Sequence, residues 1–219
     1  MVWRAARRRS PLPPAVVALT YEITRDALTP DSPDPAILHM DEDDRHDLFD
    51  LVHHDPAAAL PRLQAWVQRY PDSRTLRNWL AMAYSGVDDN VSAEQETREL
   101  YQRHPDYLFA KVAMAQFALH RGELDQVEAI FDQQFDLKLL YPHRDVFHLT
   151  EFLAFARVMV EYFLRKRNHH TARLYYDMMN KLAPDHPLTC QARQVMSGST
   201  LLRLARALSL DHLLRGGLP

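Results

Sequence analysis

Apolar residues recur at helical spacing through most of the chain. Between Pro56 and Tyr70, for example, Ala59, Leu63, Trp66 and Val67 follow one another at intervals of three, four or one positions. That spacing places all four side chains on one face of a helix. The same patterning predicts helices over residues 41–54 and 188–196, two helices within 74–107, and a last amphipathic helix over 200–214.

A fixed period connects the predicted helices. A proline followed by aspartate closes two consecutive helix pairs, at Pro71 and at Pro105. Ala59 and Ala93 keep the same interval as these prolines, so the match is in register. A period of about 34 residues is typical of stacked helical hairpins, so the chain is predicted to be a repeat array.

Residues 74–107 resemble one unit of the tetratricopeptide repeat superfamily, in its bacterial form. Ala81 and Ala93 stand at the eighth and twentieth positions, where the family has small residues that let helices pack closely, and Pro105 stands at the thirty-second. Arg77 departs from the family pattern, which has an aromatic residue at this fourth position. The resemblance implies an all-α fold, a right-handed superhelix of antiparallel helix hairpins.

An insertion interrupts the third repeat. Two periods counted from Pro105 end at Arg173, whereas the matching proline is Pro184, so additional residues must fall within 135–152. This insertion is too apolar to form a free surface loop. We expect it either to fold back onto the array or to meet a partner.

The two ends of the chain differ from the array. Residues 1–35 are expected to be a basic, proline-rich tail and linker that is partly disordered, although 15–28 would fit a strand or a helix. Residues 199–215 are expected to cap the last repeat, with a membrane-surface helix as the alternative. The predicted order is therefore a tail over 1–35, repeats over about 40–73, 74–107, 108–152 and 153–186, a further helix up to 198, and a capping helix over 199–215.

Composition narrows the environment. Hydrophobic residues make up 47% of the chain and charged residues 25%, which supplies apolar material for a core. The net charge of −3 argues against attraction of the whole protein to nucleic acid. Cys190 is the single cysteine, so no intramolecular disulfide can form and a cytoplasmic location is expected. No apolar run approaches the roughly 18 residues of a membrane span, so an integral membrane protein is not expected and the predicted partners include no membrane.

Motifs for catalysis or cofactor binding are absent from the sequence. The best metal candidate is His46, Asp50 and His53, which share one helix face, but no metalloprotease motif accompanies them. Five glycines leave no place for a phosphate-binding loop or a nucleophile elbow. We therefore predict no catalytic residue, no metal, no cofactor and no enzymatic activity; a His-based metal-dependent hydrolase is the least favoured alternative.

The resemblance implies a concave groove lined by the first helix of each repeat. A mixture of apolar and polar side chains in such a groove suits a bound peptide or helix. The candidate partner-binding residues of the groove are Asn78, Met82, Phe109, Gln116, His120, Arg157, Glu161 and Arg165. The candidates in the insertion are Leu139, Tyr141, Arg144 and Phe147.

These observations predict a non-catalytic adaptor, or a subunit of a larger assembly, that binds a protein or peptide. Self-association through the insertion is a further expectation. The alternative is a nucleic-acid-associated accessory protein that uses the arginines near the two ends. Those arginines are Arg4, Arg7, Arg8, Arg9, Arg203, Arg206 and Arg215.

Overall fold

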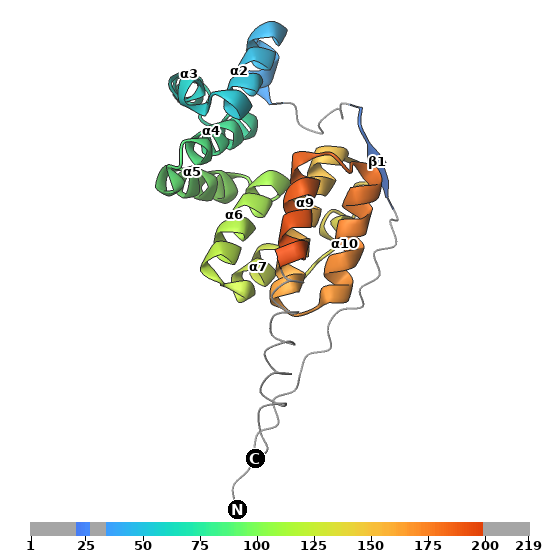
Figure 1. Ribbon diagram of the computed structural model, residues 1–219. Coiled ribbons are helices and arrows are strands. Elements are labelled where there is room, and N and C mark those ends of the chain that lie inside the picture. The colour runs from blue at the N-terminus through green and yellow to red at the C-terminus, as the bar shows by residue number, and fades with distance from the viewer. Residues whose placement is uncertain (1–20, 27–33, 199–219) are drawn as a thin grey trace, which may run out of the picture.

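The structure is a computed structural model that describes residues 21–26 and 34–198 (Figure 1). It is mostly helical, as the apolar pattern predicted. No helix within these residues is both long and apolar enough to cross a membrane. The helices are α1 (Pro35–His39), α2 (Glu42–His54), α3 (Pro56–Arg69), α4 (Arg74–Gly86), α5 (Asn90–Arg103), α6 (Leu108–Arg121), α7 (Leu124–Ile130), α8 (Leu137–Leu140), α9 (Leu149–Arg165), α10 (His169–Leu182) and a last helix over 187–198.

Local capping sets the ends of the first helices. Asp55 ends α2 and also caps α3, where its side chain accepts a hydrogen bond from the Ala58 amide at 3.1 Å. Pro56 follows at the first helical position, where a missing amide proton costs nothing. The Ser73 hydroxyl accepts from the Leu76 amide at 3.2 Å and begins α4. Because these signals are local, α2 and α3 match the predicted helices closely at both ends.

The first four helices enclose a core of small and aliphatic side chains. Leu48 of α2, Leu63 of α3 and Leu76 of α4 are fully buried, and Ala59 and Ala83 allow close approach of the helices. Helix α4 packs against α2, α3 and α5. We call this cluster the N-terminal core, formed by Ala36, Met40, Leu48, Val52, Ala59, Leu63, Leu76, Trp79, Leu80 and Ala83.

The second core lies among α6, α7, α9 and α10 and is rich in aromatic rings. Phe131 meets Phe155 edge to face, with ring centroids 5.5 Å apart, and Phe163 stacks on Tyr175 at 6.0 Å. Rings in such arrangements add to the stabilisation that burial alone provides. We call it the C-terminal core: the contiguous buried cluster between Leu108 and Ala192, joined by Tyr21.

The third hairpin is cut short where the sequence register breaks. Helix α7 ends at Ile130, and Asp132 and Gln133 follow with positive φ angles of 50° and 58°. Residues other than glycine rarely adopt this left-handed backbone conformation, and a right-handed helix cannot continue through it. Phe131 is nevertheless fully buried and anchors the end of the helix.

The insertion folds back onto the C-terminal core, together with a segment from the start of the chain. Strand β1 (Glu22–Thr24) pairs in parallel with β2 (Val146–His148), with Ile23 opposite Phe147. Figure 1 shows β1 beside the C-terminal helices, well away from α2. Of the two readings of residues 15–28, the strand is correct for residues 22–24, the part that can be assessed in the described region.

Two predicted boundaries are wrong. Helix α9 begins at Leu149 rather than near 153, because the His148 side chain and Glu151 form a capping box at its start. The last helix covers 187–198 and so extends beyond the helix predicted over 188–196. The predicted capping helix over 199–215 and most of the predicted tail lie outside the described residues.

Candidate functional site

The α4 members of the predicted groove are accessible and touch each other. Met82 is 37% exposed and Asn78 is partly exposed. The Asn78 side-chain amide lies 3.6 Å from the Met82 sulfur, one turn further along the helix. Both side chains can therefore meet a partner on this face of α4.

The α6 members are accessible to different degrees. Phe109 is partly buried against Tyr107, with ring centroids 5.6 Å apart, whereas His120 is exposed. Gln116 is partly exposed and makes no side-chain hydrogen bond within the described part of the chain. These three side chains have no common partner among the described residues.

The α9 members form an ion-pair chain along one helix. Glu161 lies 3.8 Å from Arg157 and 2.7 Å from Arg165. The Arg157 guanidinium also donates to Gln191 at 2.9 Å, from the helix over 187–198. This last helix thus partly covers the α9 side of the predicted groove.

Most of the candidate residues in the insertion make contacts within the fold. The Tyr141 hydroxyl donates to the Asp106 carbonyl at 2.8 Å, and Arg144 makes two hydrogen bonds to Glu151, at 2.7 and 3.0 Å. Phe147 is fully buried, with the Arg144 guanidinium 4.3 Å from its ring centre. Burial places Phe147 in the interior, which is the alternative in which the insertion folds back onto the array. Leu139 is the exposed member of the four, at 62%.

An open hollow between α2 and α4 presents an aromatic pair. Phe49 on α2 is 41% exposed, and its ring centre lies 5.5 Å from that of Trp79 on α4, which is buried. Met82 follows Trp79 by three positions, which places it on the same side of α4. We call this site the α2–α4 hollow; its volume is about 430 Å³ and it is lined by Glu42, Asp43, Arg45, His46, Phe49 and Trp79.

The surroundings of the α2–α4 hollow are strongly acidic. The stretch over 41–55 contains seven Asp or Glu side chains and one Arg. That Arg45 lies 3.6 Å from Glu42, and Arg62 of α3 lies 3.8 Å from Asp44. Acidic side chains therefore outnumber the cations near α2, and the face carries a negative potential.

The hollow was not predicted from the sequence. The repeat spacing predicted groove residues on α4, α6 and α9, whereas five of the six residues that line the hollow come from α2. A usable signal was Phe49, an aromatic residue on a short acidic helix with Arg45 and His53 one turn away on either side. Single exposed apolar residues are common on any surface, but aromatic residues are enriched among the anchors of binding surfaces.

The three candidate metal ligands do not converge. His46 lies 3.4 Å from Asp50, but the Nδ1 atom of His53 lies 2.9 Å from the Phe49 carbonyl and its ring packs on Phe49. No group of three His, Cys, Asp or Glu side chains suited to a metal ion occurs within residues 21–26 and 34–198. His46 instead lines the hollow, and the His53 ring packs beside the aromatic pair.

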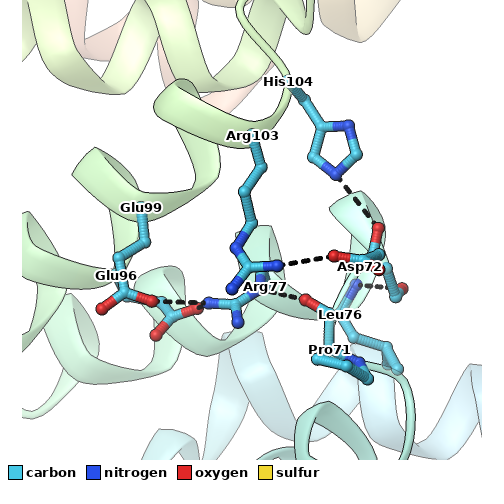
Figure 2. Close-up of polar contacts among 9 residues, drawn as sticks. Pro71, Asp72, Leu76, Arg77, Glu96, Glu99, Arg103 and His104 are labelled. Atoms are coloured by element: carbon cyan, nitrogen blue, oxygen red, sulfur yellow. Dashed lines mark hydrogen bonds and ion pairs between the residues drawn. The ribbon is translucent and has the colours of Figure 1, made fainter.

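A buried ion-pair cluster holds α4 against α5 (Figure 2). Arg77, the residue that departs from the repeat pattern, forms an ion pair with Glu96 and lies 3.3 Å from Glu99. Its Nε donates to the Pro71 carbonyl at 2.5 Å. Burial raises the pKa of Glu96, an effect that the Arg77 charge partly offsets.

Further polar contacts join the two ends of the same hairpin. Arg103 lies 2.6 Å from Asp72, and the His104 ring lies 3.0 Å from the Asp72 carbonyl (Figure 2). These contacts connect the end of α5 to the loop before α4. The cluster is thus a structural joint that positions α4, and with it Trp79, rather than a site open to a ligand.

Comparison with known proteins identifies no relative. No family model, no curated protein and no solved structure matches this chain. The arginines of the nucleic-acid alternative, at 4–9 and 203–215, lie outside the described residues.

Proposed function

We propose that this chain is a non-catalytic interaction module that binds a peptide segment of a partner protein on the exposed face of α2 and α4. The observation that carries the proposal is the α2–α4 hollow, where the half-exposed Phe49 ring lies on the buried Trp79 ring. Aromatic anchors in a hollow contribute much of the energy in protein recognition. The proposed site thus lies at the first-repeat end of the predicted groove.

The helix arrangement supports the finer part of the proposal, a tetratricopeptide-like array. Helix α4 begins at Arg74 and α6 at Leu108, one repeat period apart, and α4 packs against both helices of the preceding hairpin. In such arrays, first helices line a concave surface that takes an extended or helical segment. Asn78 and Met82, predicted from the repeat register, lie on α4 beside Trp79 and would extend the contact beyond the hollow.

Accessibility favours the α2–α4 end over the other candidates. Helix 187–198 contacts Arg157 on α9, and Phe147 of the insertion is buried. The hollow, by contrast, combines volume with an exposed ring. A cytoplasmic location is part of the same proposal and agrees with the single cysteine.

Selection of displayed random peptides against the purified full chain tests this function. We expect selected peptides to bind with an affinity that falls about tenfold or more in Phe49→Ala, the loss typical of a truncated anchor residue. Met82→Ala should weaken binding less. The matched control is Leu139→Ala, an exposed leucine on the insertion, which should leave binding unchanged.

The pattern of loss decides the outcome. Peptide binding that is insensitive to Phe49→Ala, or that disappears in Leu139→Ala, would contradict the assigned site. Failure to select any peptide, with circular dichroism showing an intact helical fold, would contradict the function itself.

A further inference from the structure

The charge and shape of the α2–α4 hollow point to a specific occupant. We propose that the hollow of one copy binds residues 200–215 of a second copy, so that the chain associates head to tail. This inference rests on the proposed peptide-binding function and names its partner. It draws on the apolar face of the segment, its charge and the position from which it leaves the fold.

The segment supplies apolar side chains at the spacing that a hollow in a helical array accepts. Residues 200–215 lie outside the described residues, and their sequence predicts an amphipathic helix. Leu201, Leu204 and Leu208 share one predicted face. A helix that binds in a groove inserts apolar side chains at such spacing. Here those side chains would contact Phe49, Trp79 and Met82.

The charges of the two partners are opposite. The segment carries Arg203, Arg206 and Arg215 against one acidic residue, Asp211. The α2 stretch over 41–55 carries seven acidic side chains against one Arg. Opposite potentials favour encounter and orient the segment, and the attraction should weaken as salt rises.

The position at which the segment leaves the fold favours the hollow of a second copy as its binding site. The helix over 187–198 is fixed beside α9 and α10: Gln191 accepts a hydrogen bond from Arg157, and Arg193 donates to Tyr176. Figure 1 shows α2 at the opposite end of the helical array, with α4, α5 and α6 between. Residue 199 alone separates this helix from the segment, and one residue spans only about 3.5 Å. The segment therefore starts on the C-terminal side of the array, away from α2, and we assign the hollow that it occupies to a second copy.

The other basic stretch of the chain fits less well. Residues 4–9 carry four arginines, but no repeated apolar face accompanies them, and prolines follow at 11, 13 and 14. Of these two basic stretches, residues 200–215 are the one that combines positive charge with apolar positions at helical spacing. Head-to-tail contact uses different surfaces on each copy, so it can extend to chains or close into rings.

Sedimentation velocity of the full-length chain over a range of concentrations and salt tests the inference. We expect association that grows with concentration and weakens with added sodium chloride. Leu204→Glu/Leu208→Glu should abolish association, and Phe49→Ala should weaken it about tenfold. A synthetic peptide of residues 199–215, added in excess, should dissociate the assembly.

Charge exchange gives the sharper test. The variant Glu42→Lys/Asp43→Lys, tested by itself, should not associate. The variant Arg203→Glu/Arg206→Glu, tested by itself, should not associate either. Mixing these two full-length variants should restore a complex, because each then supplies the charge that the other lacks. The matched control is Asp125→Lys/Asp185→Lys, which makes the same change of net charge at exposed positions outside α2 and should associate as the parent chain does.

The outcomes separate this inference from the proposed function. A chain that stays monomeric, with no binding of the 199–215 peptide, overturns the inference. If peptides selected from the displayed library still bind in a Phe49-dependent manner, the proposed function stands and the occupant comes from another protein. If no peptide of either kind binds, both proposals fail.

Discussion

The two ends of this molecule treat their aromatic residues in opposite ways. Around the C-terminal core, rings pack on rings: Phe135 stacks on Tyr162 at 5.0 Å, and Tyr21 meets Phe147 edge to face at the same separation. At the N-terminal end, the Phe49 ring packs on Trp79 but keeps 41% of its surface exposed. Similar helical hairpins therefore end in a sealed core on one side and an open hollow on the other.

The difference arises from what covers each end. The insertion, strand β1 and the helix over 187–198 all pack on the C-terminal helices. The N-terminal core is covered by the short helix α1, which buries Ala36 but leaves the ring of Phe49 accessible. The sealed end, which is the C-terminal core with the elements that cover it, therefore contributes stability. The open end, at the α2–α4 hollow, leaves an aromatic ring that a partner could contact. The following predictions test that division, beginning with the largest effect.

Loss of a ring from the sealed end should cost the most stability. We expect Phe147→Ala to lower the free energy of unfolding by about 3–5 kcal/mol, because it leaves a cavity among Tyr21, Tyr141 and the C-terminal core. Chemical denaturation followed by circular dichroism measures the change. Leu139→Ala, at an exposed position of the same insertion, is the control and should change stability by less than about 0.5 kcal/mol. Equal effects of the two would refute the sealed-end assignment.

Loss of the ion pair that joins α4 to α5 should cause the next largest loss of stability. Arg77→Ala removes the cation from a pair whose side chains are only 7% and 15% exposed, which leaves Glu96 buried without its partner. We expect a loss of about 3 kcal/mol in the free energy of unfolding. Arg77→Met combined with Glu96→Leu should be far less damaging, since a hydrophobic pair leaves no charge to desolvate. A double variant no more stable than Arg77→Ala would argue against the buried charge as the cause.

Alkaline pH should affect the sealed end selectively. Burial raises the pKa of Tyr21, Tyr162 and Tyr175 well above the ordinary value of 10, with Glu128 adding to the effect at Tyr162. A raised folded-state pKa gives stability that is present below the unfolded pKa and lost as pH rises beyond it. We therefore expect destabilisation to begin above about pH 10.

Tyrosinate absorbance and near-ultraviolet circular dichroism, recorded through the same titration, measure that effect. Phenolate absorbance from the buried tyrosines should appear together with loss of the ring signals of the C-terminal core. The buried residues of the N-terminal core include no tyrosine. Full ionisation of all tyrosines with an unchanged near-ultraviolet spectrum would contradict the prediction.

The smallest effect on stability is expected at the open end. Phe49→Ala removes a half-exposed ring and should cost at most about 1 kcal/mol in the free energy of unfolding, the scale of one aromatic contact. The same denaturation experiment measures it beside Phe147→Ala. A cost as large as that of Phe147→Ala would show that Phe49 is a core residue, and the contrast between the two ends would fail.

Local signals in the sequence were enough for most of the helices. The acidic first turn of α2, Pro56 after Asp55, and the repeat period located the first two hairpins close to their structural bounds. The loss of register placed the insertion within 135–152, whereas α7 ends earlier, at Ile130. These features depend on residues close together in the chain or on a regular spacing, so they can be read without knowing the fold.

The candidate site was only partly accessible to sequence reasoning. Asn78 and Met82 were predicted from the repeat register and lie on the accessible face of α4. Phe49 was not predicted, because its importance depends on the Trp79 ring, which lies on a different helix. For Phe147 the sequence left two alternatives open, since an apolar side chain fits an interface and an interior equally well, and the structure places it in the interior.

The sequence by itself determined that the chain is mostly helical and where α2 and α3 begin and end, because caps, prolines and apolar spacing act over a few residues. Only the tertiary structure decided that strand β1 crosses to β2, that the insertion seals the C-terminal core, and that Arg77 joins α4 to α5. It also decided that an acidic helix and an aromatic pair meet in one hollow. Each of these depends on contacts between residues far apart in the chain, whose pairing is fixed by packing of the whole molecule.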